Sequence, residues 1–318
     1  MHSRADHQHR RIGHASTAET RSSGWRDHGA ARRGRTAVRR STMDTHMPDE
    51  IVRLTRELRR AREEIKCYGE LLLAIQRSIL PHQLPDVPGL DLAVHFADVD
   101  GPGGDYYDVR PVGPDHWAIV IADVSGHGLA AAAILALVHA LGNAMQGQVV
   151  PAAPAAALTL INGPLATRYL TDTGQFVTAF VSLFDARSQV LTYSSAGHPP
   201  LRLIRGDEVR RLGAASGLPM GIETTSEYRN EAVQLLAGDR LVLFTDGITE
   251  STNAAHERFG DPRLDAVLRR PASTAAQLLD DIVTSVQTFR GGRPPDDDET
   301  CLVAVVKAGP AASPEPRK

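Results

Sequence analysis

Two apolar segments that each lead into an aspartate constrain this chain more than any other feature. The segment Trp117–Ile121 is followed by Asp123, and the segment Leu241–Phe244 is followed by Asp246. Both segments are typical of buried strands, and a buried carboxylate costs several kcal/mol unless it is paired or bound to a metal. Because two separate strands deliver the same kind of acidic turn, the sequence predicts that Asp123 and Asp246 share one cation.

Two further acidic motifs are candidates for the same site. Asp105 follows two glycines at the start of an expected strand, where glycine allows close approach of the backbone or positive φ, although such a motif alone is more often a turn. The acidic run at residues 296–299 precedes another expected strand, so it is either a solvated loop or the source of one more ligand.

The expected ligands are all oxygen atoms, which favours Mg²⁺ or Mn²⁺ over Zn²⁺. Two such ions roughly 3.5–4 Å apart would activate a water and hold phosphoryl oxygens, so a nucleophilic side chain is not needed. The sequence contains no GxSxG motif, and Ser125 lacks a clear His and Asp partner.

Histidines and turns near these motifs have plainer interpretations. His127 suits either a general acid or a structural histidine of its turn, and His198 is expected to pack or to hydrogen bond rather than to line the site. The segments Ala196–Pro200 and Gly217–Gly221 are typical of turns between strands.

From Gly89 onward, short strands and a few helices cluster rather than alternate, which predicts an antiparallel α+β domain with helices over packed sheets. The expected strands are 90–97, 105–111, 116–123, 176–184, 189–195, 200–205, 231–236, 240–245 and 300–307. The expected helices are Ala130–Gln146, Ala153–Tyr169 and Thr274–Phe289.

The chain before this domain has two parts. Residues 1–47 are polar, with ten Arg against four Asp or Glu in residues 1–45, and are expected to be disordered, as are residues 309–318. Residues 48–84 are expected to form an amphipathic linker helix that ends near Pro81. This helix either packs on its own domain or acts as a switch that forms a homodimer through residues 48–80.

Bulk properties exclude several classes of protein. The net charge of −3 leaves about −9 outside the basic start, so nucleic acid is not an expected partner. No apolar run is long enough for a membrane span and the start lacks a signal sequence, so a cytoplasmic location is expected. Cys67 and Cys301 lack the spacing of a zinc site or a disulfide framework.

Six ordered motifs between about residues 75 and 307 resemble the metal-dependent serine/threonine protein phosphatase (PPM) superfamily, in its bacterial SpoIIE/RsbU-like branch. Gln76–Pro81 also looks like the linker of that branch. The motifs are Gly103–Asp108, Asp123–Gly128, Ala196–Pro200, Gly217–Gly221, Phe244–Gly247 and Asp297–Thr300.

The resemblance implies a central antiparallel β-sandwich flanked by helices (α-β-β-α) over residues 85–308, with two Mn²⁺ or Mg²⁺ ions between the sheets. Asp123 would bridge both ions, and the carbonyl of Val124 would hold one of them. Asp246 and Asp297 would complete the other. Asp105 would act directly or through water, so Asp105, Asp123 and Asp246 are the expected catalytic residues.

Three features depart from the family pattern. Glu299 stands where a hydrophobic residue is usual, and the additional Asp296 shifts the possible register, so Asp297 is the first choice of ligand and Asp298 the second. The phosphate-binding arginine of eukaryotic members has no evident counterpart. No sensory domain is expected before the helix.

The implied activity is removal of phosphate from phosphoserine or phosphothreonine in an anti-sigma-factor antagonist (STAS-like) protein, opposing a serine kinase. Two alternatives remain open at this point. One is a catalytically weak phosphatase-like domain that binds a phosphoprotein as a regulator, and the other is a small-molecule phosphatase that uses the same metals.

Overall fold

The computed structural model of the protein describes residues 47–99, 101–144, 153–213 and 216–308. The expected disorder of residues 1–46 and 309–318 lies outside these ranges. The chain divides into two compact units, Met1–Leu54 and Thr55–Lys318, and the fold described below is that of the second. Helix α1, Met47–Ile79, is present where the sequence predicted a helical linker. No described helix is long and apolar enough to cross a membrane.

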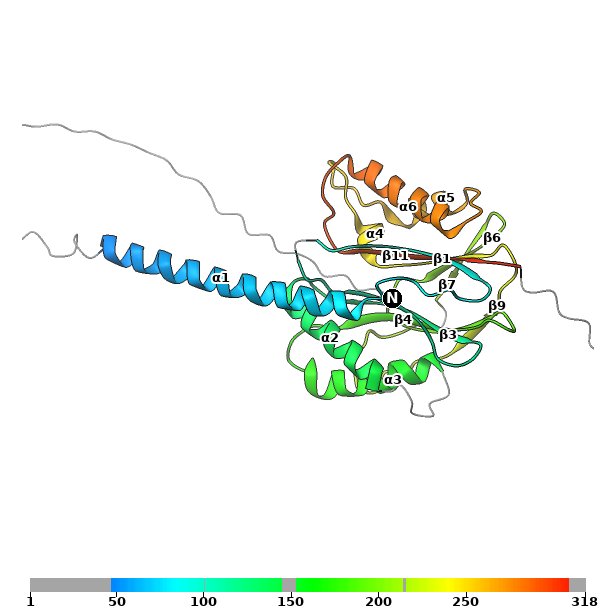
Figure 1. Ribbon diagram of the computed structural model, residues 1–318, viewed down its shortest axis with the longest axis horizontal. Coiled ribbons are helices and arrows are strands. Elements are labelled where there is room, and N and C mark those ends of the chain that lie inside the picture. Colours follow the sequence, from blue (N-terminus) through cyan, green and yellow to red (C-terminus); the bar gives the residue numbers. More distant parts are fainter. Residues whose placement is uncertain (1–46, 100, 145–152, 214–215, 309–318) are drawn as a thin grey trace, which may run out of the picture. The chain divides into compact units, whose positions relative to one another are not determined.

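Two sheets form the centre of the unit Thr55–Lys318, and Figure 1 shows them stacked between layers of helices. Sheet A has the order β1 (Leu90–Ala97), β11 (Glu299–Val306), β10 (Arg240–Phe244), β6 (Leu201–Arg205) and β7 (Glu208–Leu212). Sheet B has the order β2 (Asp105–Pro111), β3 (His116–Val124), β4 (Val177–Asp185), β5 (Val190–Ala196) and β8 (Ser216–Gly217), and β9 (Glu231–Gln234) also pairs with β5. All of these pairs are antiparallel except β5 with β8.

Helices cover the outer face of each sheet (Figure 1). On sheet B lie α2 (Leu129–Ala144) and α3 (Pro154–Pro164), the latter continuing into a π-helical turn, Leu165–Tyr169. On sheet A lie α4 (Asp246–Glu250), α5 (Gly260–Leu268) and α6 (Ala275–Arg290). The predicted α+β sandwich with flanking helices is therefore confirmed.

Burial on both faces explains the continuous apolar runs of the central strands. Along β11, Leu302, Ala304 and Val306 belong to the core that joins the two sheets, whereas Val303 and Val305 belong to the core beneath α5 and α6. Side chains alternate between the faces of a strand, so a strand covered on both sides has no polar face. The acids at the ends of β3 and β10 are thus delivered by strands that lie deep in the fold.

All nine expected strands are present, with bounds shifted by at most two residues. The sequence prediction missed β7, β8, α4 and α5. Strand β7 is largely exposed at the edge of sheet A, so it carries little apolar periodicity. Helix α4 has only 5 residues, and α5 carries Pro262 in its first turn, so neither gives a long helical pattern.

Candidate metal centre

Pairing within sheet B brings the first two predicted acids together. Strands β2 and β3 are antiparallel, and their register places Asp105 directly opposite Asp123. The N–H of Val124 donates to the carbonyl of Gly104 at 3.2 Å, so this pairing continues past the start of β2. Directly opposed residues have closely spaced side chains, and here both are carboxylates.

Hydroxyl groups from sheet A hold the carboxylate of Asp105. The hydroxyls of Thr245 and Thr300 both donate to Oδ2 of Asp105, at 2.7 Å and 2.6 Å. The two threonines are themselves joined, because the N–H of Thr300 donates to the hydroxyl of Thr245 at 3.1 Å. Asp105, which is 2% exposed, therefore connects the two sheets and has a fixed orientation. Both threonines lie within the sequence motifs and adjoin an acid, but the sequence predicted no role for them.

The carboxylates repel one another in a buried setting. Burial, and then the charges of Asp246, Asp297 and Asp298, raise the pKa of Asp123 to about 7. Burial and the charge of Asp123 raise the pKa of Asp105 well above its usual value. Burial and then the charge of Asp297 raise the pKa of Asp246. Among the described residues, no cation is a cause of these three shifts, so the site has the electrostatics of a cation receptor.

Glycine keeps the ligand atoms accessible. A Cβ on Gly104 would lie 2.6 Å from the carbonyl oxygen of Val124 and 3.3 Å from Oδ1 of Asp123. In the described ranges, no three Asp, Glu, His or Cys side chains lie close enough together to hold an ion by themselves. The donors present are the carboxylates of Asp105 and Asp123 and the carbonyl of Val124, and oxygen donors of this kind fit a hard cation that also binds water, as Mg²⁺ does.

The three consecutive aspartates at residues 296–298 have different surroundings. Asp296 is exposed and accepts hydrogen bonds from the N–H and hydroxyl of Thr252, at 3.2 Å and 2.5 Å. Asp298 is 5% exposed and accepts main-chain N–H groups on both oxygens. Asp297 is exposed, and its Oδ1 accepts from the N–H of Asp298 at 2.9 Å. Within the described ranges, no hydrogen bond involves Oδ2 of Asp297.

Glu299, which replaces the usual hydrophobic residue, is buried in an ion pair. Its Oε1 pairs with Nη1 of Arg290, and its Oε2 lies 3.8 Å from Nε2 of His95. Glu299 is 3% exposed and Arg290 is 6% exposed. This pair joins the last residue of α6 to the first residue of β11, on either side of the loop that carries Asp297.

The two histidines of the motifs differ in environment. His127 is exposed. His198 is buried, its Nδ1 lies 2.9 Å from the hydroxyl of Thr178, and burial lowers its pKa to about 3. A neutral buried imidazole agrees with the packing and hydrogen-bonding role predicted for His198.

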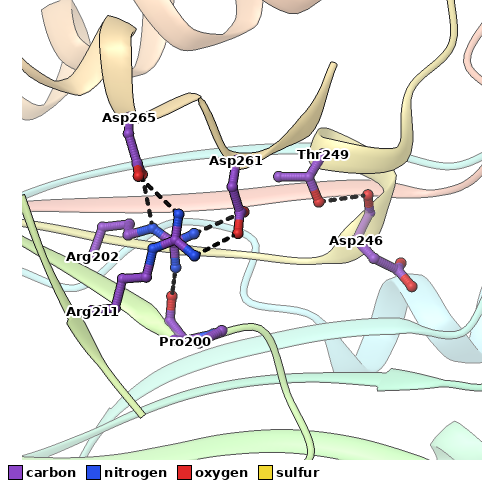
Figure 2. A network of polar contacts seen from close by, with 7 residues as sticks. All are labelled: Pro200, Arg202, Arg211, Asp246, Thr249, Asp261 and Asp265. Carbon is purple, nitrogen blue, oxygen red and sulfur yellow. Dashed lines mark hydrogen bonds and ion pairs between the residues drawn. The ribbon is translucent and has the colours of Figure 1, made fainter. Parts of the chain in front are cut away.

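A second polar network lies on the outer side of sheet A (Figure 2). Arg202, which is fully buried, pairs with Asp261 at 2.7 Å and with Asp265 at 3.0 Å. Arg211 pairs with the same two aspartates at 2.8 Å and 2.9 Å. The guanidinium of Arg202 also lies over the ring of Phe244, 5.2 Å from its centroid, so the network supports the strand that precedes the metal centre. The sequence did not predict this network.

Comparisons with known proteins agree with this geometry. The family model described as Stage II sporulation protein E (SpoIIE) matches residues 113–307, more than half of the chain. The phosphoserine phosphatase RsbU of Bacillus subtilis (strain 168) is 28% identical over 226 residues, which cover 70% of this chain and 65% of RsbU. The SiaA-PP2C domain of Pseudomonas aeruginosa has a TM-score of 0.68 at 26% identity, covering 78% of this chain and 99% of that domain.

The catalytic domain of the serine threonine protein phosphatase PstP, solved in complex with 2 manganese ions, has the same fold at a TM-score of 0.51 and 18% identity. That match covers 69% of this chain and 99% of the PstP domain. The two-sheet sandwich with acids gathered from both sheets defines a phosphatase domain of the PPM type. The chain belongs to the SpoIIE family. It spans 40% to 65% of the length of the curated relatives IcfG, RsbP and RsbU.

Proposed function

We propose that this chain is a metal-dependent phosphoprotein phosphatase that hydrolyses phosphoserine or phosphothreonine. Residues 85–308 form the catalytic domain and residues 48–84 its helical linker. The observation that carries the proposal is the convergence of Asp105, Asp123 and Asp246 from both sheets, with pKa values raised by burial and by the charges of neighbouring carboxylates. The similarity to RsbU, a phosphoserine phosphatase, supports the same activity.

The proposed cofactor is a pair of Mn²⁺ or Mg²⁺ ions, by analogy with the PstP domain and its 2 manganese ions. Asp123, the carbonyl of Val124, Asp246 and Asp297 would hold these ions. Asp105 would act directly or through water. When bound, such a cation supplies a water of lowered pKa and neutralises charge on the phosphoryl oxygens.

The chain's own residues prepare the site for this chemistry. The hydroxyls of Thr245 and Thr300 occupy Oδ2 of Asp105, which leaves its Oδ1 to face a ligand or a water. Asp297 is preferred over Asp296 because the charge of Asp297 raises the pKa of both Asp123 and Asp246, whereas Asp296 is hydrogen bonded to Thr252.

The proposed substrate is a phosphorylated anti-sigma-factor antagonist of the STAS-like kind, as the resemblance to the SpoIIE/RsbU-like branch implies. The proposed location is the cytoplasm, since Cys67 and Cys301 are both free thiols. A substrate trap made by Asp246→Asn should retain a phosphoprotein in a pull-down from the native cell extract. Faster hydrolysis of nucleotides or sugar phosphates than of any phosphoprotein would instead favour the small-molecule alternative.

A direct assay tests the proposed activity. The purified chain should hydrolyse p-nitrophenyl phosphate and a phosphoserine protein only with added Mn²⁺ or Mg²⁺. Asp123→Ala and Asp246→Ala should each abolish turnover, because each removes a ligand. Asp207→Ala, a change in the exposed turn between β6 and β7, is the matched control and should leave turnover unchanged. Turnover that survives in EDTA would refute the proposal.

We also propose that the linker helix forms a homodimer through residues 48–80. Several large apolar side chains on α1 are more than half exposed, among them Leu58, Ile65, Tyr68 and Leu71. An apolar stripe on an otherwise charged helix is typical of a helix that packs against a partner. In sedimentation, the double variant Leu58→Glu/Ile65→Glu should be monomeric, whereas the parent and the control Arg60→Glu, on the opposite face of the helix, should be dimeric. A monomeric parent would exclude the dimer.

A further inference from the structure

The structure assigns Asp298 a positioning role: we infer that it does not bind the metal but fixes the turn that carries Asp105. This inference deepens the proposed function and rests on the site described for it. Oδ1 of Asp298 accepts the N–H of Val99 at 2.9 Å, and Oδ2 accepts the N–H of Gly104 at 3.0 Å. The two bonds, here called the Asp298 clamp, connect the start of β11 to a turn almost 200 residues earlier in the chain.

Close contacts with Asp298 explain why glycine occupies two of the motif positions. A Cβ on Gly103 would lie 1.7 Å from Oδ2 of Asp298, and a Cβ on Gly247 would lie 2.0 Å from the carbonyl oxygen of Asp298. Neither glycine adopts a positive φ, so each is required by space rather than by backbone conformation. Two glycines that lie 144 positions apart in the sequence therefore pack against one residue.

The clamp lies next to the proposed ligands. Gly104 is followed directly by Asp105, and its carbonyl accepts the N–H of Val124 at 3.2 Å. The turn has a second anchor at Gly103, whose N–H donates to the side chain of Gln76 at 3.0 Å. Release of the Asp298 clamp would therefore free the turn on the side of Gly104 and displace Asp105 relative to the carbonyl of Val124.

Asp298 and Asp297 differ in their hydrogen bonding and in their burial. Both oxygens of Asp298 accept main-chain N–H groups in a buried position. Asp297 is exposed and has only one of its oxygens bonded by a described residue. A carboxylate that accepts one amide on each oxygen loses those bonds if it turns towards a cation, and a buried amide left without its acceptor carries a desolvation cost. Asp297 has no such cost.

Amide hydrogen exchange on the metal-free full chain tests the clamp without relying on activity. In Asp298→Ala, exchange at the N–H groups of Val99 and Gly104 should accelerate at least about tenfold, because their acceptor is gone. Asp297→Asn and the exposed control Asp296→Asn should leave both rates within about twofold of the parent. Unchanged rates in Asp298→Ala would overturn the inference.

Calorimetry with Mn²⁺ alone distinguishes a positioning residue from a ligand. Asp298→Asn retains one oxygen acceptor, so it should keep the parent's number of bound ions and lose affinity by no more than about tenfold. Asp297→Asn should lose an ion or weaken its binding by about a hundredfold. An equal loss of ions in the two variants would show that Asp298 is a ligand.

A double substitution tests the steric part of the inference. Gly103→Ala should weaken Mn²⁺ binding in the parent, because the added methyl group meets the carboxylate of Asp298. In the Asp298→Ala background the same change should cause little further loss, because the obstructing carboxylate is gone. Additive losses would contradict this account. Amide exchange and Mn²⁺ binding are measured without turnover. An inactive parent would therefore refute the proposed function, whereas the Asp298 clamp would still be tested by these two measurements.

Discussion

Replacing Asp123 by Asn should stabilise the metal-free protein at about pH 8, although it removes a proposed metal ligand. Burial and the charges of Asp246, Asp297 and Asp298 raise the pKa of Asp123 from 3.8 to about 7. A rise of about three pKa units, at about 1.4 kcal/mol per unit, gives an upper limit of about 4 kcal/mol for the cost of ionising this carboxyl in the folded state. Relaxation of the neighbouring acids reduces this cost. We therefore expect Asp123→Asn to raise the free energy of unfolding by about 1–3 kcal/mol.

The sign of the pH dependence follows from the direction of the shift. A carboxyl whose pKa is raised by folding binds more protons in the folded state than in the unfolded state, so its cost is absent below pH 3.8. The cost grows as the pH rises and is complete above about pH 7. The advantage of Asp123→Asn should therefore be largest at about pH 8 and small at about pH 4.5.

Urea unfolding in EDTA at these two pH values measures this effect, with Asp296→Asn as the matched control. Hydrogen bonds from Thr252 lower the pKa of Asp296, so its replacement should not stabilise the protein at any pH. Added Mn²⁺ should stabilise the parent and leave Asp123→Asn nearly unchanged. A gain for Asp123→Asn that is absent, independent of pH or matched by the control would refute the electrostatic reasoning.

Three further predictions concern the same fold. Mn²⁺ affinity should rise between about pH 6 and pH 8 with release of protons, because the cation displaces them from Asp123 and its neighbours. Calorimetry in buffers of different ionisation enthalpy measures this, and an affinity independent of pH would contradict it. Arg202→Met should lower the free energy of unfolding in urea by about 3–5 kcal/mol, because it leaves Asp265 without its buried partner. Arg211 is half exposed, so Arg211→Met should lower the free energy of unfolding by less than about 1 kcal/mol. Equal losses in the two variants would refute this contrast. Glu299→Met should also lower the free energy of unfolding by about 3–5 kcal/mol, because it leaves the charge of Arg290 buried without its partner. The double variant Glu299→Met/Arg290→Met removes both charges and should recover most of that loss. Additive losses would show that the two residues do not act as a pair.

The sequence predicted the sheets well because most strands carry an unambiguous signal. Strands β10 and β11 are buried on both faces and therefore consist largely of apolar residues, bounded by polar turns. Strand β7 and helix α5 gave no such signal. Their positions depend on ion pairs, in which Arg202 of β6 and Arg211 of β7 both pair with Asp261 and Asp265 of α5. Contacts of that kind join residues about 50–60 positions apart and leave no local pattern.

The candidate site was predictable in its residue types but not in its hydrogen bonding. The apolar strands that lead to Asp123 and Asp246 indicated a shared cation, and the structure places the two residues close enough that the charge of Asp246 raises the pKa of Asp123. The roles of Thr245 and Thr300 depend on pairing across the two sheets, which the sequence does not contain. The three aspartates at residues 296–298 are chemically identical in sequence and differ only in which groups they meet.

The most direct test of the central claim is a single-turnover assay of phosphate release from a phosphoserine protein. Enzyme should be in excess over substrate, with Mn²⁺ titrated into protein first treated with EDTA. The account predicts no release without metal, saturable release with Mn²⁺, and none for Asp123→Ala at any Mn²⁺ concentration. Release in EDTA, or Mn²⁺-dependent release that persists in Asp123→Ala, would contradict it.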